Sequence, residues 1–178
     1  PRDLPYRDGT AAMLYKAERR IAMIREAVGE EVDLCLELHR RLEPGLAIQL
    51  SARLEPYAPM FLEDPIRPDN FDAMAEVAQK CRIPIATGER IHTAHEFEML
   101  LARGACSYVR VSLGVCGGFT GAKKIAAVAE AHHASLVPHN PLSPVMTCAV
   151  LQFAAATDNI AICEYPNPYA ASTADHLT

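Results

Sequence analysis

The sequence lacks any run of apolar residues long enough to cross a bilayer, and its polar first eight residues do not resemble a secretory signal peptide. It also lacks an excess of positive charge, since the formal net charge is -5 at pH 7. We therefore expect neither a nucleic-acid-binding nor a membrane-binding protein. The GxGxxG and P-loop motifs of nucleotide-binding proteins are absent as well.

Closely spaced cysteine pairs are also lacking. None of the six cysteines belongs to a CxxC motif, five lie in apolar segments, and Cys116 lies in a turn-like stretch. This distribution predicts small buried thiols in a reducing compartment rather than disulfides or a zinc site. We therefore expect a cytoplasmic protein.

What the sequence does contain is a regular alternation of strand-like and helix-like segments. Half of its 178 residues are hydrophobic, which suits the core of one domain. Apolar runs of strand length alternate with segments of helical spacing, and this order predicts parallel βαβ units. The expected helices cover residues 10–28, 44–54, 70–80, 94–102, 118–133 and 144–156. The expected strands cover residues 32–38, 59–62, 83–87, 108–113, 135–138 and 160–163.

Charged residues follow these strands at nearly equal intervals. Glu37, Glu63 and Glu89 end the first three strands, and 63 − 37 and 89 − 63 both equal 26. His139 and Glu164 follow the fifth and sixth strands. In a TIM-type barrel all strands point their C-terminal ends to one face, where active sites are built. The spacing therefore favours an α/β chain forming about six of the eight strands of such a barrel, with the first two strands missing.

The three glutamates form a candidate metal site. Carboxylates on three adjacent strands can converge on one hard cation, and Mg²⁺ prefers such oxygen ligands. Each glutamate taken alone could be a solvated or capping residue. Their equal strand-end positions favour Mg²⁺ binding by Glu37, Glu63 and Glu89, and the oxygen ligands favour magnesium over zinc.

Two histidines are candidates for proton transfer near neutral pH. His39 lies two residues after Glu37, so strand alternation would place both on one face. His139 follows a strand in the segment PHNPLSP, and either histidine could instead be structural. Arg110 could bind a substrate carboxylate or pair with a glutamate, whereas Glu164 could hydrogen-bond a developing enolate, orient His139 or form an ion pair.

Five segments together resemble the mandelate racemase branch of the enolase superfamily, in particular its acid sugar dehydratases. They are FLEDPIRPDNF, IPIATGERIHTAHEF, VCGGFTGAKKIAAVAEAHH, LVPHNPLSPV and IAICEYP, which lie between Val32 and Pro166. The resemblance implies a (β/α)7β barrel next to a separate α+β capping domain. Residues 1–178 would then be an incomplete C-terminal catalytic barrel domain, without the capping domain.

The resemblance also implies a reaction and its residues. A base removes the proton α to a carboxylate, and the 3-hydroxyl leaves to give a 2-keto-3-deoxy sugar acid. The family pattern implies Mg²⁺ bound by Glu37, Glu63 and Glu89, with His139 as base, His39 as acid and Glu164 as an electrophilic or orienting group. The substrate-binding residues would be Arg110, His39, His139 and Glu164. The expected partners are a small-molecule sugar acid and, in the full-length protein, further copies of the same chain.

The sequence departs from the family pattern at two positions. Glu37 replaces the more usual Asp, and Ser112 stands where an Asp often supports the histidine base. Ser112 is closer to the mannonate dehydratase-like members, whereas PHNPLSP is closer to the galactonate dehydratase-like ones. A racemase or epimerase of the same superfamily, and an inactive fragment of such an enzyme, are the alternative interpretations.

Overall fold

The computed structural model describes residues 9–141 and 143–166. The chain divides into two compact units, which are taken one at a time below. The first unit contains the described residues up to Thr87 together with Arg103–Ser107. The second contains Gly88–Ala102 and the described residues from Tyr108 onward. In these described parts, no helix is both long enough and apolar enough to span a membrane.

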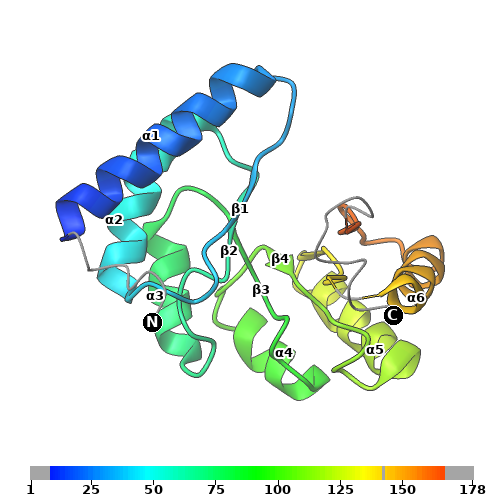
Figure 1. The fold of residues 1–178 in the computed structure, drawn as a ribbon. Coiled ribbons are helices and arrows are strands. Elements are labelled where there is room, and N and C mark those ends of the chain that lie inside the picture. The colour runs from blue at the N-terminus through cyan, green and yellow to red at the C-terminus, as the bar shows by residue number, and fades with distance from the viewer. Residues whose placement is uncertain (1–8, 142, 167–178) are drawn as a thin grey trace. The chain divides into compact units, whose positions relative to one another are not determined.

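The first unit consists of strands that alternate with helices (Figure 1). β1 pairs in parallel with β2, and β2 pairs in parallel with β3, while α2 packs against both α1 and α3. The elements are α1 (Thr10–Val28), β1 (Cys35–Glu37), α2 (Pro44–Leu54), a short 3-10 helix (Glu55–Tyr57), β2 (Phe61–Glu63), α3 (Phe71–Lys80) and β3 (Ile85–Thr87). The predicted parallel βα order is confirmed.

Local signals explain where these helices begin and end. α1 stops at Gly29, whose φ of 77° suits a residue without a Cβ. Pro44 opens α2, where its missing N–H costs nothing. The side chain of Asn70 caps α3 by accepting a hydrogen bond from Ala73 N at 3.0 Å. All three signals are readable in the sequence.

The core of this unit lies around β2 and β3, whereas the edge strand β1 is not part of it. β2 and β3 are buried throughout, as predicted for strands covered on both faces. They share the core with Met74 and Val77 of α3, both 0% exposed. β1 is largely exposed, because within the described residues of this unit it has a partner strand on one side only.

The second unit repeats the same order of elements. It contains α4 (Ala94–Leu101), β4 (Tyr108–Val109), α5 (Gly118–Ala131), β5 (Ser135–Leu136) and α6 (Pro144–Ala155). β4 and β5 are parallel, and α4 packs against α5. Thr93 and Glu96 form a capping box at the start of α4, and the Thr93 hydroxyl lowers the pKa of Glu96. Ser143 caps α6.

The predicted strands are longer than the observed ones, and the last predicted strand is wrong. In place of a strand at 160–163, Ile160 makes one isolated parallel bridge to Leu136. Leu136 N donates to Asn159 O, and Ala161 N donates to Leu136 O. The next donor along this ladder would be Pro138, which has no N–H, so the pairing stops there.

The cysteines are free thiols, but they are less buried than predicted. All six lie in the described residues, where Cys116 is buried and Cys81, Cys106 and Cys163 are partly exposed. Cys35 and Cys148 are exposed, because Cys35 belongs to the exposed strand β1 and Cys148 to the outer side of α6. Desolvation raises the pKa of the Cys106 thiol to about 12.

We expect Cys106 to resist alkylation while Cys148 reacts. A solution at about pH 8 is about four pH units below the pKa of the Cys106 thiol. Only about 10⁻⁴ of this thiol is therefore present as the nucleophilic thiolate. Brief iodoacetamide treatment of the folded protein, followed by peptide mass spectrometry, measures both sites. Comparable modification of the two cysteines would contradict the raised pKa of the Cys106 thiol, and labelling in urea serves as the control for complete reactivity.

Candidate active site

Two carboxylates lie side by side at the strand ends of the first unit. Glu37 ends β1, Glu63 ends β2, and the two residues are register partners. Residues in register on adjacent strands point to the same face of the sheet, and a carboxylate oxygen of one glutamate lies within 4.8 Å of one from the other. Glu63 is 6% exposed and Glu37 is exposed. The structure therefore brings together two of the three predicted metal ligands.

The third predicted ligand follows directly along the chain. Glu89 comes two residues after Thr87, the last residue of β3, and belongs to the second unit, where it is 8% exposed. Gly88 before it has a φ of 138°, and a Cβ there would lie 2.7 Å from Cε1 of Phe97. Glycine therefore lets the chain pass close to the Phe97 ring and turn to place Glu89.

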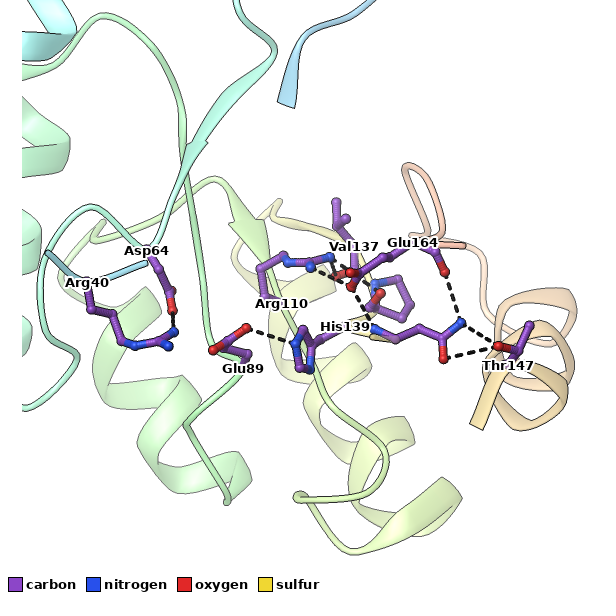
Figure 2. Close-up of polar contacts among 10 residues, drawn as sticks. Arg40, Asp64, Glu89, Arg110, Val137, His139, Thr147 and Glu164 are labelled. Atoms are coloured by element: carbon purple, nitrogen blue, oxygen red, sulfur yellow. Dashed lines mark hydrogen bonds and ion pairs between the residues drawn. The ribbon is translucent and has the colours of Figure 1, made fainter. Parts of the chain in front are cut away.

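Glu89 contacts the histidine that was predicted to act as a base. Its Oε2 lies 2.9 Å from Nε2 of His139. Figure 2 shows the two side chains pointing toward each other. The backbone N–H of His139 donates to Val111 O at 2.9 Å, which ties the histidine to the residues after β4. Glu89 thus places a carboxylate beside this histidine, whereas the position where the family often has a supporting Asp is Ser112 in this sequence.

His39 does not continue the alternation of β1. The strand ends at Glu37, and both His39 and Arg40 have left-handed backbone conformations, with φ of 52° and 60°. The argument that His39 shares the face of Glu37 by strand alternation is therefore wrong. Instead, His39 is exposed in a turn, and its backbone N–H donates to Oε1 of Glu37.

Asp64 is a buried charged residue that the sequence analysis missed. Its Oδ1 accepts a hydrogen bond from Thr87 Oγ1 at 2.6 Å. Its Oδ2 pairs with Nη1 of Arg40, as Figure 2 shows. The Asp64 side chain is 2% exposed. The signal in the sequence was its place in FLEDP, directly after a predicted ligand. Its two partners could not be foreseen without the register of the strands.

Glu164 is held by several donors in the second unit. Arg110 Nη2 donates to its Oε2 at 2.7 Å, and the backbone N–H of Asn140 donates to the same oxygen at 2.7 Å (Figure 2). Arg110 is 4% exposed and also donates to the carbonyl oxygens of Val137 and Pro138, at 3.0 and 3.4 Å. Of the alternatives for Arg110, the structure shows the pairing with a glutamate.

Asn140 and Thr147 support the same segment and were not singled out in the sequence. Asn140 is 0% exposed, and its Nδ2 donates to Thr147 Oγ1 at 3.0 Å and to Glu164 O at 3.1 Å. One asparagine therefore binds the chain around Glu164 through both its backbone and its side chain. Its position in PHNP, next to His139, was the only hint.

The fold and these groups define a class of protein: an α/β protein of successive parallel βα units, with carboxylates and histidines after the strands, as in TIM-type barrel enzymes. Residues 9–178 match the family model described as Enolase C-terminal domain-like. The chain belongs to this family, whose fold is the C-terminal barrel of the enolase superfamily.

Individual relatives also support membership of this family. The chain is 37% identical to the D-galactonate dehydratase of Ralstonia pickettii (strain 12J) over 142 residues, which are 80% of this chain and 37% of that protein. It matches a mandelate racemase/muconate lactonizing enzyme-like protein from Roseovarius sp. TM1035 with 38% identity and a TM-score of 0.85, over 90% of this chain and 41% of the other.

A second solved structure is an enolase from Agrobacterium radiobacter with bound Na and L-malate. It has 32% identity and a TM-score of 0.87, over 92% of this chain and 43% of the other. The chain thus spans less than half the length of each of these relatives.

Proposed function

We propose that this chain carries the metal-binding and acid–base groups of a Mg²⁺-dependent acid sugar dehydratase. The observation that carries the proposal is the in-register pair of Glu37 and Glu63 at adjacent strand ends, in a member of the enolase C-terminal domain-like family. Its relatives include proteins named D-galactonate dehydratase from two Ralstonia strains.

The donor set suits magnesium. Glu37 and Glu63 offer carboxylate oxygens side by side, and Glu89 follows the end of the strand next to β2. Hard oxygen ligands with few nitrogen or sulfur donors favour Mg²⁺ over zinc. When bound, the ion supplies Lewis-acid stabilisation of negative charge on the substrate carboxylate.

The remaining groups account for the proton transfers. His139 takes the proton from the carbon α to the carboxylate, and the Glu89 carboxylate at 2.9 Å attracts the positive charge that the ring gains. His39 donates a proton to the departing 3-hydroxyl, which leaves as water. The electron pair of the broken C–H bond forms the C=C bond, and the resulting enol becomes the 2-keto-3-deoxy acid.

Glu164 is proposed to orient the substrate. Arg110 and the Asn140 N–H hold its Oε2 in place. A carboxylate with one oxygen fixed by the protein can accept a hydroxyl hydrogen bond from a sugar acid on the other. In this proposal Arg110 acts on the substrate indirectly, by holding Glu164.

The product formed by the full-length protein distinguishes dehydration from racemisation. Incubation with Mg²⁺ and a panel of aldonic and aldaric acids in D₂O should yield 2-keto-3-deoxy acid from one of them, with galactonate and mannonate tested first. Deuterium at the α carbon without keto acid would instead show a racemase or epimerase. The 178-residue chain assayed alone is the control, and we expect it to show no turnover.

A further inference from the structure

Three residues that the proposed mechanism does not use connect the strand ends of the first unit. They are Arg40 after β1, Asp64 after β2 and Thr87 at the end of β3. We propose that these residues form a positioning network that holds the strand-end glutamates and the turn after β1 in the geometry needed to bind Mg²⁺. The inference rests on the proposed function, since it gives the network a task in metal binding.

Asp64 lies at the centre of the network. Its side chain is 2% exposed, and each of its carboxylate oxygens has a different partner. Thr87 Oγ1 donates to Oδ1 at 2.6 Å, and Arg40 Nη1 donates to Oδ2. A buried carboxylate bonded on both oxygens has one orientation, because any rotation would leave a buried polar group without its partner. Asp64 therefore links all three strands of this unit at their C-terminal ends.

The backbone around the network is strained. His39, Arg40 and Asp64 have φ values of 52°, 60° and 42°, in the left-handed region that residues with a Cβ seldom adopt. Such conformations persist only where surrounding contacts enforce them, and they gather at functional sites. Here the Arg40 N–H donates to Asp64 O at 2.7 Å, and the side chains of the same two residues also pair.

Both glutamates are attached to these strained segments. Glu63 is the last residue of β2, and the left-handed backbone of Asp64 directly after it turns the chain out of the strand. Glu37 Oε1 accepts the backbone N–H of His39, which is in the left-handed turn. If the network were broken, the turn could relax and both carboxylates would lose their fixed positions. Partners of metal ligands act in this way, and their loss reduces metal affinity or activity about 10- to 100-fold.

Substitutions at Thr87 separate positioning from packing. Thr87→Val keeps the shape of the buried side chain and removes the hydroxyl, whereas Thr87→Ser keeps the hydroxyl and removes a methyl group. Thr93→Val is the matched control, because it also removes a threonine hydroxyl that binds a carboxylate, but at the capping box of α4. Asp64→Asn is a second variant, which removes the charge that pairs with Arg40.

The measurement is Mg²⁺ binding to the full-length protein by isothermal titration calorimetry, with urea unfolding to confirm that each variant folds. We expect Thr87→Val and Asp64→Asn to weaken Mg²⁺ binding about 10- to 100-fold. Thr87→Ser should bind Mg²⁺ with an affinity within about threefold of the wild type. Thr93→Val should lower the urea midpoint of unfolding without weakening Mg²⁺ binding.

Two failures can be told apart. Folded Thr87→Val and Asp64→Asn proteins that bind Mg²⁺ as tightly as the wild type would overturn the positioning network and leave the metal site intact. Loss of affinity in Thr87→Ser equal to that in Thr87→Val would also overturn it, since packing would then explain both. A wild-type protein that does not bind Mg²⁺ would overturn the proposed function itself.

Discussion

Replacing Glu63 with glutamine should remove Mg²⁺-dependent turnover from the full-length protein. The change keeps the size of a side chain that is 6% exposed and replaces one charged ligand oxygen by an amide nitrogen. A Lewis-acid metal contributes several kcal/mol to catalysis, and each 1.4 kcal/mol is tenfold in rate. We therefore expect kcat/KM to fall at least about 100-fold, together with the heat of Mg²⁺ binding in calorimetry.

The matched control for this variant is Glu76→Gln. Glu76 belongs to the same unit and makes an exposed i, i+4 ion pair with Lys80, at 2.6 Å between Oε1 and Nζ. Such pairs contribute about 0.3–0.5 kcal/mol, so kcat/KM and Mg²⁺ binding should stay at the wild-type level. Metal-dependent turnover retained by Glu63→Gln would refute its role as a ligand.

Replacing Gly121 with alanine should strongly destabilise the fold. Gly121 lies in α5, and a Cβ there would lie 1.7 Å from the carbonyl oxygen of Cys116. That oxygen belongs to the backbone of the turn before α5, so the clash cannot be relieved by rotating a side chain. Overpacking lowers the free energy of unfolding by about 1–3 kcal/mol. We expect a backbone clash at this distance to lower it by an amount at or above the top of that range. The free energy of unfolding in urea should therefore fall by about 3 kcal/mol or more.

Gly45→Ala provides the control with the opposite sign. Gly45 lies in the first turn of α2, and no atom lies within 4 Å of the Cβ that alanine would add. Alanine favours a helix over glycine by up to about 1 kcal/mol, so this variant should be at least as stable as the wild type. If Gly121→Ala unfolded at the same urea concentration as Gly45→Ala, the close packing of α5 on the preceding turn would be wrong.

Helix bounds were predictable wherever a local residue sets them. α1 and α2 have the predicted bounds, because glycine ends the first and proline opens the second. Strand lengths were overestimated. An apolar run in the sequence indicates burial, but a strand also requires backbone hydrogen bonds to a neighbouring strand. Val111 and Leu113 are buried as predicted, yet they lie beyond β4, which ends at Val109.

The candidate site was predictable where it follows the βα repeat and not where it depends on contacts. The interval of 26 residues placed Glu37 and Glu63 at strand ends, and the structure makes them register partners. The importance of Asp64 could not be foreseen, because its two partners lie 24 and 23 residues away in sequence. The left-handed turn at His39 could not be predicted either, because the turn contains no glycine or asparagine, the residues that usually adopt this conformation.

The single bridge between Leu136 and Ile160 has a consequence for motion around Glu164. Stretches held by few backbone hydrogen bonds open at low free energy, well below that of global unfolding. Residues 160–164 belong to such a stretch, and beyond Ala161 it is anchored through Glu164 by Arg110 and Asn140. We therefore expect the amide protons of residues 160–163 to exchange with solvent faster than those in the middle of α5. Glu164, held by Arg110 and Asn140, is the point at which this weakly paired stretch is fixed again to the rest of the second unit.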